Sequence, residues 1–146
     1  YLLRMPNPQN AKYLEWAIWF EKHIPFMHDD VILVGHSLGA IFLAKYLSES
    51  TFTKIVKGTF MVAGPYNEDE GKYLHEFSIT HPLDKFKAQG GNIFIYHSKD
   101  DPVVAFTEME KYKKELREAT YRIFEDRMHF NMEEFPEIVE DIRNSF

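Results

Sequence analysis

The stretch Val31-Ile32-Leu33-Val34-Gly35-His36-Ser37-Leu38-Gly39 decides the fold of this chain. Its four leading apolar residues follow the turn residues Asp29-Asp30 and are typical of a parallel strand that helices cover on both faces. Apolar residues at helical spacing follow between 41 and 47. A G-x-S-x-G sequence between a buried strand and a helix predicts a nucleophile elbow, a sharp turn that exposes the serine hydroxyl. A glycine-rich turn with no catalytic role is the alternative.

The same alternation of strand and helix continues on both sides of this stretch. Tyr1–Met5 is interpreted as the end of a strand, and Asn10 is a candidate cap for a helix that carries Leu14–Glu21 and ends at Pro25. Further strands are predicted at Ile55–Ala63, Ile93–Tyr96 and Tyr121–Phe124, and further helices at Thr107–Glu118 and Glu133–Arg143. Such alternation indicates βαβ units, a parallel sheet and one α/β domain over residues 1–146.

Composition excludes several classes of protein. The chain has 146 residues, 45% hydrophobic and 27% charged, which is ordinary for one globular domain. Its net charge of −6 disfavours nucleic-acid binding, because phosphate contacts need a basic face. No apolar run reaches the roughly 20 residues of a membrane span. The absence of cysteine excludes disulfides and thiolate chemistry, is compatible with a reducing compartment, and leads us to expect a cytoplasmic protein.

A serine hydroxyl becomes a good nucleophile only when a base takes its proton. In an α/β chain with this elbow, the partners follow in the order Ser, Asp, His. Asp100-Asp101-Pro102 follows one predicted strand and His129 follows another, so both lie at the edge of the sheet that bears Ser37. We expect Ser37 to attack a carbonyl, His129 to move the proton, and an aspartate to orient the imidazole.

The choice between the two aspartates rests on the backbone. Asp101 precedes proline and is therefore biased to an extended conformation, which favours it as the partner of His129. Asp100 could instead cap the turn. The backbone N–H of Leu38, the residue after the serine, is the expected oxyanion donor.

The remaining histidines and aromatic residues have weaker signals. His97 follows a strand and could line a pocket or be hydrogen-bonded in place, and His36 is expected to pack beneath the serine. The other four histidines show no metal-ligand spacing, so no metal or cofactor is expected. Tyr66, Tyr73 and Phe77 could roof an apolar acyl pocket or belong to the core, and the sequence identifies no substrate-binding residue.

Four segments together resemble one family: Met5-Pro6-Asn7-Pro8, Val31–Ala40, Ser98-Lys99-Asp100-Asp101-Pro102 and His129-Phe130. They are similar, over essentially the whole chain, to the small serine hydrolases named for a retinoblastoma-binding protein, also called YdeN-like. The resemblance implies a three-layer α/β-hydrolase-type fold with a mostly parallel central sheet. It also implies a triad of Ser37, Asp101 and His129.

Two departures accompany the resemblance. Members often have glycine before the catalytic histidine, where this chain has Met128. The family also begins with a further strand and a glycine-rich loop ahead of the region matching Tyr1–Pro8, and that loop would supply a second oxyanion N–H. We therefore expect the single domain 1–146 to be incomplete at its N-terminus and to lack that first strand.

The expected activity is hydrolysis of a small or medium acyl ester, thioester or amide through an acyl-enzyme on Ser37. A carboxylic ester is the default substrate, and transfer to another acceptor would differ only in the step that deacylates the serine. The alternative from another class is a protein-interaction module, with a protein partner or self-association, that uses a hydrolase scaffold with little turnover.

Overall fold

The computed structural model describes residues 2–67 and 74–146. Its sheet has four strands in the order β1 (Val31–His36), β2 (Val56–Val62), β3 (Asn92–Ser98) and β4 (Thr120–Phe124), and every neighbouring pair is parallel. Helices connect the strands: α1 (Tyr13–His23) precedes β1, α2 (Leu38–Glu49) follows it, α3 (Asp84–Gln89) precedes β3, α4 (Phe106–Glu115) follows β3, and α5 (Pro136–Ser145) ends the chain. The predicted α/β fold with a parallel sheet is confirmed.

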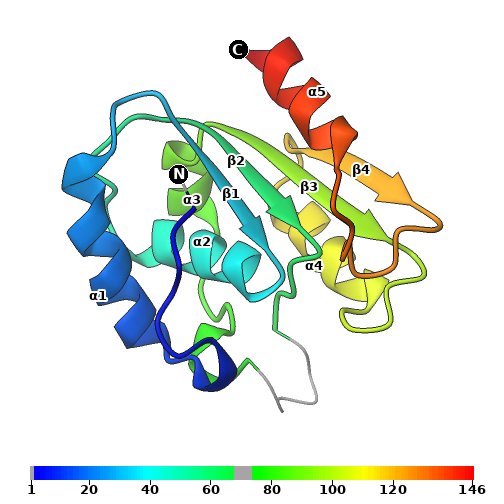
Figure 1. Ribbon diagram of the computed structural model, residues 1–146, viewed down its shortest axis with the longest axis horizontal. Coiled ribbons are helices and arrows are strands. Elements are labelled where there is room, and N and C mark those ends of the chain that lie inside the picture. The colour runs from blue at the N-terminus through cyan, green and yellow to red at the C-terminus, as the bar shows by residue number, and fades with distance from the viewer. Residues whose placement is uncertain (1, 68–73) are drawn as a thin grey trace.

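Figure 1 shows helices on both faces of the sheet, and a hydrophobic core lies on each face. The larger core joins one face of the sheet to α1, α2, α3 and α4, and the fully buried Phe86, Met109 and Tyr112 belong to it. The smaller core lies on the other face, where Phe60 and Tyr96 meet Ile138 and Ile142 of α5. The sheet is therefore the middle of three layers, with α5 covering one side.

The edge strand β1 is less covered than its sequence predicts. Val34 is 56% exposed, so the expectation of helices over both faces is wrong at this residue. Among residues 2–67 and 74–146, β1 pairs only with β2, and its outer edge has no strand beside it. No helix in this described part of the chain has the length and hydrophobicity needed to cross a bilayer.

The N-terminal segment differs most from its prediction. Leu2–Met5 is not a strand; instead the indole N–H groups of Trp19 and Trp16 donate to the carbonyls of Arg4 and Pro6, at 3.0 and 2.8 Å. This segment therefore lies against α1 through side-chain bonds and not through a ladder. Tyr1 is outside the described residues.

The first helix begins later than predicted and buries only part of its apolar residues. Asn10 lies in a short 3₁₀ turn, Pro8–Asn10, and Lys12 is the N-cap of α1. Trp16 and Phe20 are buried, whereas Leu14 and Ile18 are 64% and 47% exposed. Two further 3₁₀ turns, Ile24–Phe26 and His75–Phe77, and helix α3 were not predicted.

The turn from β1 to α2 is tightly packed at its first glycine. A Cβ on Gly35 would lie 2.5 Å from the carbonyl oxygen of Gly39, closer than real Cβ contacts. A Cβ on Gly39 would meet no described atom within 4 Å. The residue between them, Ser37, has φ 52°, a conformation that costs a non-glycine residue about 1–3 kcal/mol. Close packing at Gly35 holds the serine in that conformation.

Helix α5 is fixed to the sheet through one carboxylate. The buried hydroxyl of Tyr96 donates to Asp141 at 2.8 Å, and Arg122 donates twice, at 2.6 and 3.0 Å. These bonds, with that of Arg122 first, hold the pKa of Asp141 below its ordinary value. The carboxylate is therefore ionised at neutral pH and joins α5 to β3 and β4.

Replacing Asp141 with Ala should lower the free energy of unfolding by about 2–3 kcal/mol, because the buried Tyr96 hydroxyl loses its acceptor. Since the pKa of Asp141 is depressed by folding, its contribution is present above the ordinary carboxyl pKa of about 3.9 and is lost in stronger acid. Urea titrations at several pH values should therefore show the difference from wild type shrinking below about pH 4. The exposed Glu140→Ala variant is the control, and an equal effect there would contradict this assignment.

The two glycines of the elbow should respond oppositely to alanine. Gly35→Ala should destabilise the protein by about 3 kcal/mol, because the new methyl group meets backbone atoms of the next turn. Gly39→Ala places its methyl group in open space within α2 and should be neutral or stabilise the protein by up to about 1 kcal/mol. Thermal unfolding of the pair measures this, and equal melting temperatures would contradict the packing argument.

Candidate active site

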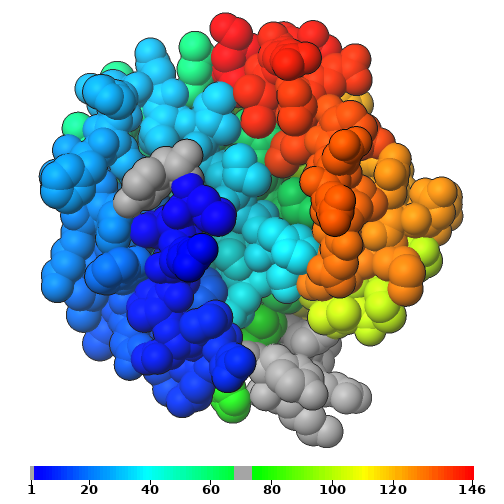
Figure 2. Space-filling model, viewed as in Figure 1, coloured from blue at the N-terminus to red at the C-terminus, as the bar shows by residue number. Residues whose placement is uncertain are grey.

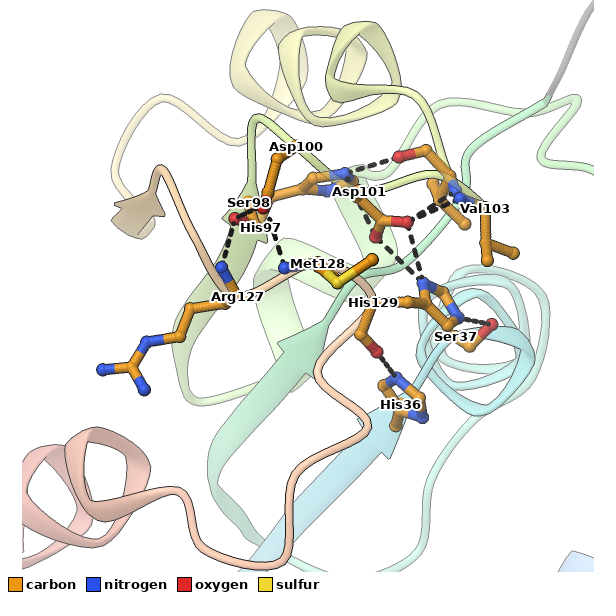
Figure 3. Close-up of polar contacts among 11 residues, drawn as sticks. His36, Ser37, His97, Ser98, Asp100, Asp101, Val103, Arg127, Met128 and His129 are labelled. Atoms are coloured by element: carbon orange, nitrogen blue, oxygen red, sulfur yellow. Dashed lines mark hydrogen bonds and ion pairs between the residues drawn. The ribbon is translucent and has the colours of Figure 1, made fainter.

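Three loops at one edge of the sheet bring the predicted site residues together (Figure 3). Ser37 follows β1, Asp101 lies in the loop after β3, and His129 lies in the loop after β4. Because the strands are parallel and in register, their carboxyl ends share one edge, and ligand sites of open α/β sheets lie there.

Hydrogen bonds connect these three side chains in series. Nε2 of His129 lies 3.0 Å from Oγ of Ser37, and Nδ1 lies 2.9 and 3.1 Å from the two carboxylate oxygens of Asp101. The carboxylate accepts from Nδ1–H, which leaves Nε2 as the acceptor for the serine proton. This tautomer is the one a general base at this position requires.

The carboxylate of Asp101 is shielded from solvent and well supplied with donors. Its side chain is 0% exposed, and it accepts from the backbone N–H groups of Val103 and Val104, at 2.8 and 3.0 Å. With His129, these donors compensate the cost of burying a charge.

Asp100 does not bind the imidazole of His129 and has two other partners. Its Oδ1 accepts from the Ser98 hydroxyl at 2.5 Å and from the Met128 N–H at 2.9 Å. Of the two aspartates that the sequence offered, the structure brings Asp101 and not Asp100 to the imidazole of His129. The bonds of Asp100 go to backbone and hydroxyl groups, so sequence spacing gave no signal for them.

The oxyanion donor expected from the sequence lies at a helix start. Leu38 is the first residue of α2, and the first N–H groups of a helix have no acceptor within the helix. Its N–H is therefore available beside Ser37, where the helix dipole also favours negative charge.

Two further histidines flank the site, both neutral. Desolvation is the main cause that lowers the pKa of His36 and of His97. His36 Nε2 donates to the carbonyl of His129 at 2.8 Å, and the two rings lie 4.8 Å apart. His97 is 0% exposed and donates to the carbonyl of Val104 at 3.0 Å, so it is hydrogen-bonded in place and does not line a pocket.

The backbone around His129 is strained. Met128 and Phe130 have φ of 46° and 55°, and the N–H of Phe130 donates to the carbonyl of Arg127 at 2.9 Å, closing a turn. A glycine would adopt the first of these conformations freely. Met128, which departs from the family pattern, adopts it at a cost.

An open pocket of about 650 Å³ lies beside Ser37 and Leu38. Three parts of the chain form its walls: the N-terminal segment, the loop after β3, and residues between β2 and α3. The residues that line it, besides Ser37 and Leu38, are Pro8, Gln9, Asn10, Ala11, Lys12, Pro65, Leu74, His75, Pro102, Val103 and Val104. Figure 2 shows the N-terminal segment (dark blue) and the loop before α5 (orange) on either side of the cyan surface of β1 and the start of α2.

The described aromatic residues that could have covered an acyl pocket, Tyr66 and Phe77, do not line the pocket beside Ser37. Tyr66 and Phe77 are 8% and 2% exposed and belong to the larger core. Tyr73 lies outside the described residues. Within residues 2–67 and 74–146 there is no group of three or more potential metal ligands.

Two acids of α4 hold the chain that borders this pocket. The buried Glu108 accepts from the N–H groups of Tyr66 and Asn67, at 2.7 and 2.9 Å. Glu115 accepts from the Tyr66 hydroxyl and from the N–H of Leu83. The segment after β2 is thus attached to α4 through backbone N–H groups and through side chains, among them the Tyr112 hydroxyl that donates to the Pro65 carbonyl.

Comparisons with known proteins identify relatives of this chain. Rat serine hydrolase RBBP9 is 28% identical over 142 residues, which are 96% of this chain and 74% of the relative. Putative hydrolase YdeN of Bacillus subtilis is 25% identical over 126 residues, which are 84% of this chain but only 65% of that relative. The crystal structure of the ydeN gene product from B. subtilis superposes with a TM-score of 0.88 at 21% identity, covering 99% of this chain and 80% of that one.

These findings confirm the resemblance inferred from the sequence. The superposition with the ydeN gene product, at 21% identity, concerns the fold alone. A family model described as "Serine hydrolase" matches residues 2–141, nearly the whole chain. The chain therefore belongs to the serine hydrolase family, with an α/β-hydrolase fold.

Proposed function

We propose that the chain hydrolyses a small or medium acyl ester through an acyl-enzyme formed on Ser37. The observation that carries this proposal is the series of hydrogen bonds from Ser37 through His129 to the buried Asp101. A carboxylate, an imidazole and a hydroxyl in this order make the hydroxyl a nucleophile at neutral pH.

Acylation follows from the positions of the groups. Oγ of Ser37 attacks the carbonyl carbon while its proton moves to Nε2 of His129, and the ester C–O bond then breaks as His129 returns the proton to the leaving alcohol. Asp101 stabilises the imidazolium and fixes its orientation. The Leu38 N–H faces the developing oxyanion, and one such donor contributes about 3 kcal/mol.

Deacylation reverses these roles with water as the nucleophile. His129 takes a proton from water, the hydroxide attacks the acyl carbon, and Ser37 leaves with the proton that Nε2 returns. Thioesters and amides differ in the leaving group, and another acceptor in place of water would make the reaction a transfer. The apolar pocket residues Leu38, Leu74 and Val104 support an apolar acyl group of limited size.

Replacing Ser37 with Ala should abolish the hydrolysis of p-nitrophenyl esters, because no other group lies within bonding distance of Nε2 of His129 in the described residues. A fluorophosphonate probe should add one adduct to the wild-type mass, and the adduct should be missing in Ser37→Ala. Intact-mass spectrometry and absorbance assays make both measurements.

The outcomes separate the candidate functions. Undiminished turnover in Ser37→Ala would contradict the proposed nucleophile. A wild-type protein that folds but neither labels nor turns over any ester in a wide panel would instead support an interaction module on a hydrolase scaffold. His129→Ala is the matched variant: it removes the proposed base but keeps the serine hydroxyl, so the roles of base and nucleophile are tested separately.

Activity should rise with pH from the acid side, because His129 must be neutral to accept the serine proton. The lowered pKa values of His36 and His97 keep both rings neutral as the pH falls toward the ordinary imidazole range, so they do not add charge near the site there. The pH profile of kcat/KM for an ester measures this rise. A rate that stays flat from about pH 5 to about pH 9 would tell against an imidazole base.

A further inference from the structure

The residues on each side of His129 adopt a conformation that their own chemistry disfavours. Met128 and Phe130 both have positive φ, and such residues persist only where the surrounding structure imposes them. The turn that they form carries the imidazole whose Nε2 must meet Ser37. Whatever imposes this turn therefore also directs the base.

One set of contacts comes from the loop after β3. The Ser98 side chain is fully buried; its hydroxyl accepts from the Arg127 N–H at 3.0 Å and donates to Asp100 at 2.5 Å. The same oxygen of Asp100 accepts from the Met128 N–H at 2.9 Å. Two consecutive backbone N–H groups before His129 are thus bound by one hydroxyl–carboxylate pair.

The other contact comes from β1, on the far side of the turn. Nε2 of His36 donates to the carbonyl of His129 at 2.8 Å, and a carbonyl can only accept, so the proton is on Nε2. Figure 3 shows His36 below the His129 backbone and Asp100 above it, near Met128. The peptide groups on both sides of the base are held from opposite directions.

We propose that Asp100 and His36 are positioning residues that impose the strained turn around His129 and so aim its Nε2 at Ser37. This inference rests on the proposed function. In this assignment the two neighbouring aspartates have different partners: Asp101 binds the ring of His129, and Asp100 binds the backbone N–H of the residue before it.

Charge and location agree with this role for Asp100. The Ser98 bond is the main cause that holds the pKa of Asp100 below its ordinary value, so the group is an ionised acceptor at neutral pH. Asp100 does not line the pocket beside Ser37, and it has no contact with the Ser37 or His129 side chains in the described residues. Its removal should therefore change the chemical step and leave substrate binding alone.

The first test compares Asp100→Ala with Asp100→Asn. The alanine variant loses both bonds, and misplacement of the base should lower kcat between about 10-fold and about 100-fold while KM stays unchanged. The asparagine variant keeps an acceptor oxygen and should retain most of kcat. Asp126→Ala is the control, since Asp126 lies in the loop that carries His129, its side chain is 88% exposed, and it pairs with Arg127 at 4.0 Å.

A second pair of variants tests the opposite side of the turn and remains informative if Asp100→Ala does not fold. His36→Phe keeps a ring against that of His129 but has no N–H, so kcat should fall with KM unchanged. His36→Gln places an amide N–H near the position of Nε2 and should recover part of the loss.

A spectroscopic readout separates positioning from general structure. The proton between Asp101 and Nδ1 of His129 should give a low-field NMR resonance in wild type, and this resonance should broaden or vanish in Asp100→Ala and His36→Phe while the melting temperature changes little. This readout does not depend on turnover.

Three results would overturn the proposal: an unchanged kcat in both Asp100→Ala and His36→Phe, equal losses in Asp100→Ala and Asp100→Asn, or an unchanged resonance in the variants. If Ser37 of the wild type neither labels nor turns over esters, the proposed function fails separately. The resonance would still report whether Asp100 and His36 hold His129 in place.

Discussion

The buried carboxylate of Asp101 is the constraint on which the site depends. A charge with no exposure to water needs donors on all sides, and the loop after β3 supplies two of them from its own backbone. The third comes from His129, on a different loop. The need to compensate one charge therefore joins the β3 and β4 loops. Because the strands are parallel, Ser37 lies at the same edge of the sheet, within hydrogen-bond distance of His129.

The sequence predicts the strands, and it singles out the three side chains that the structure brings together, for physical reasons. The apolar runs Val31–Val34, Phe60–Ala63 and Ile93–Tyr96 mark strands β1 to β3, and such runs are typical of parallel strands, although the edge strand β1 leaves Val34 exposed. The position of Ser37 follows from the elbow motif, and the choice of Asp101 over Asp100 follows from the restriction that Pro102 places on its neighbour. Each of these signals is local to a few residues, so no alignment is needed to interpret it.

The features that the sequence did not predict depend on contacts between distant segments. Leu14 and Ile18 have the spacing of a buried face, but α1 buries only Trp16, Ala17 and Phe20, and Trp16 and Trp19 donate to the backbone of the N-terminal segment. The bonds of His36 and Asp100 end on backbone groups, which every residue has. A pattern of side chains cannot identify such partners.

The attachment of the pocket border to α4 has a consequence for divergence among related enzymes. Glu108 binds the N–H groups of Tyr66 and Asn67, and Glu115 binds that of Leu83. Any residue other than proline offers the same donor, so substitutions at positions 66, 67 and 83 preserve these backbone bonds. These bonds fix the main chain directly after the pocket residue Pro65, so the side chains that line the pocket can change while two glutamates on a neighbouring helix keep its path.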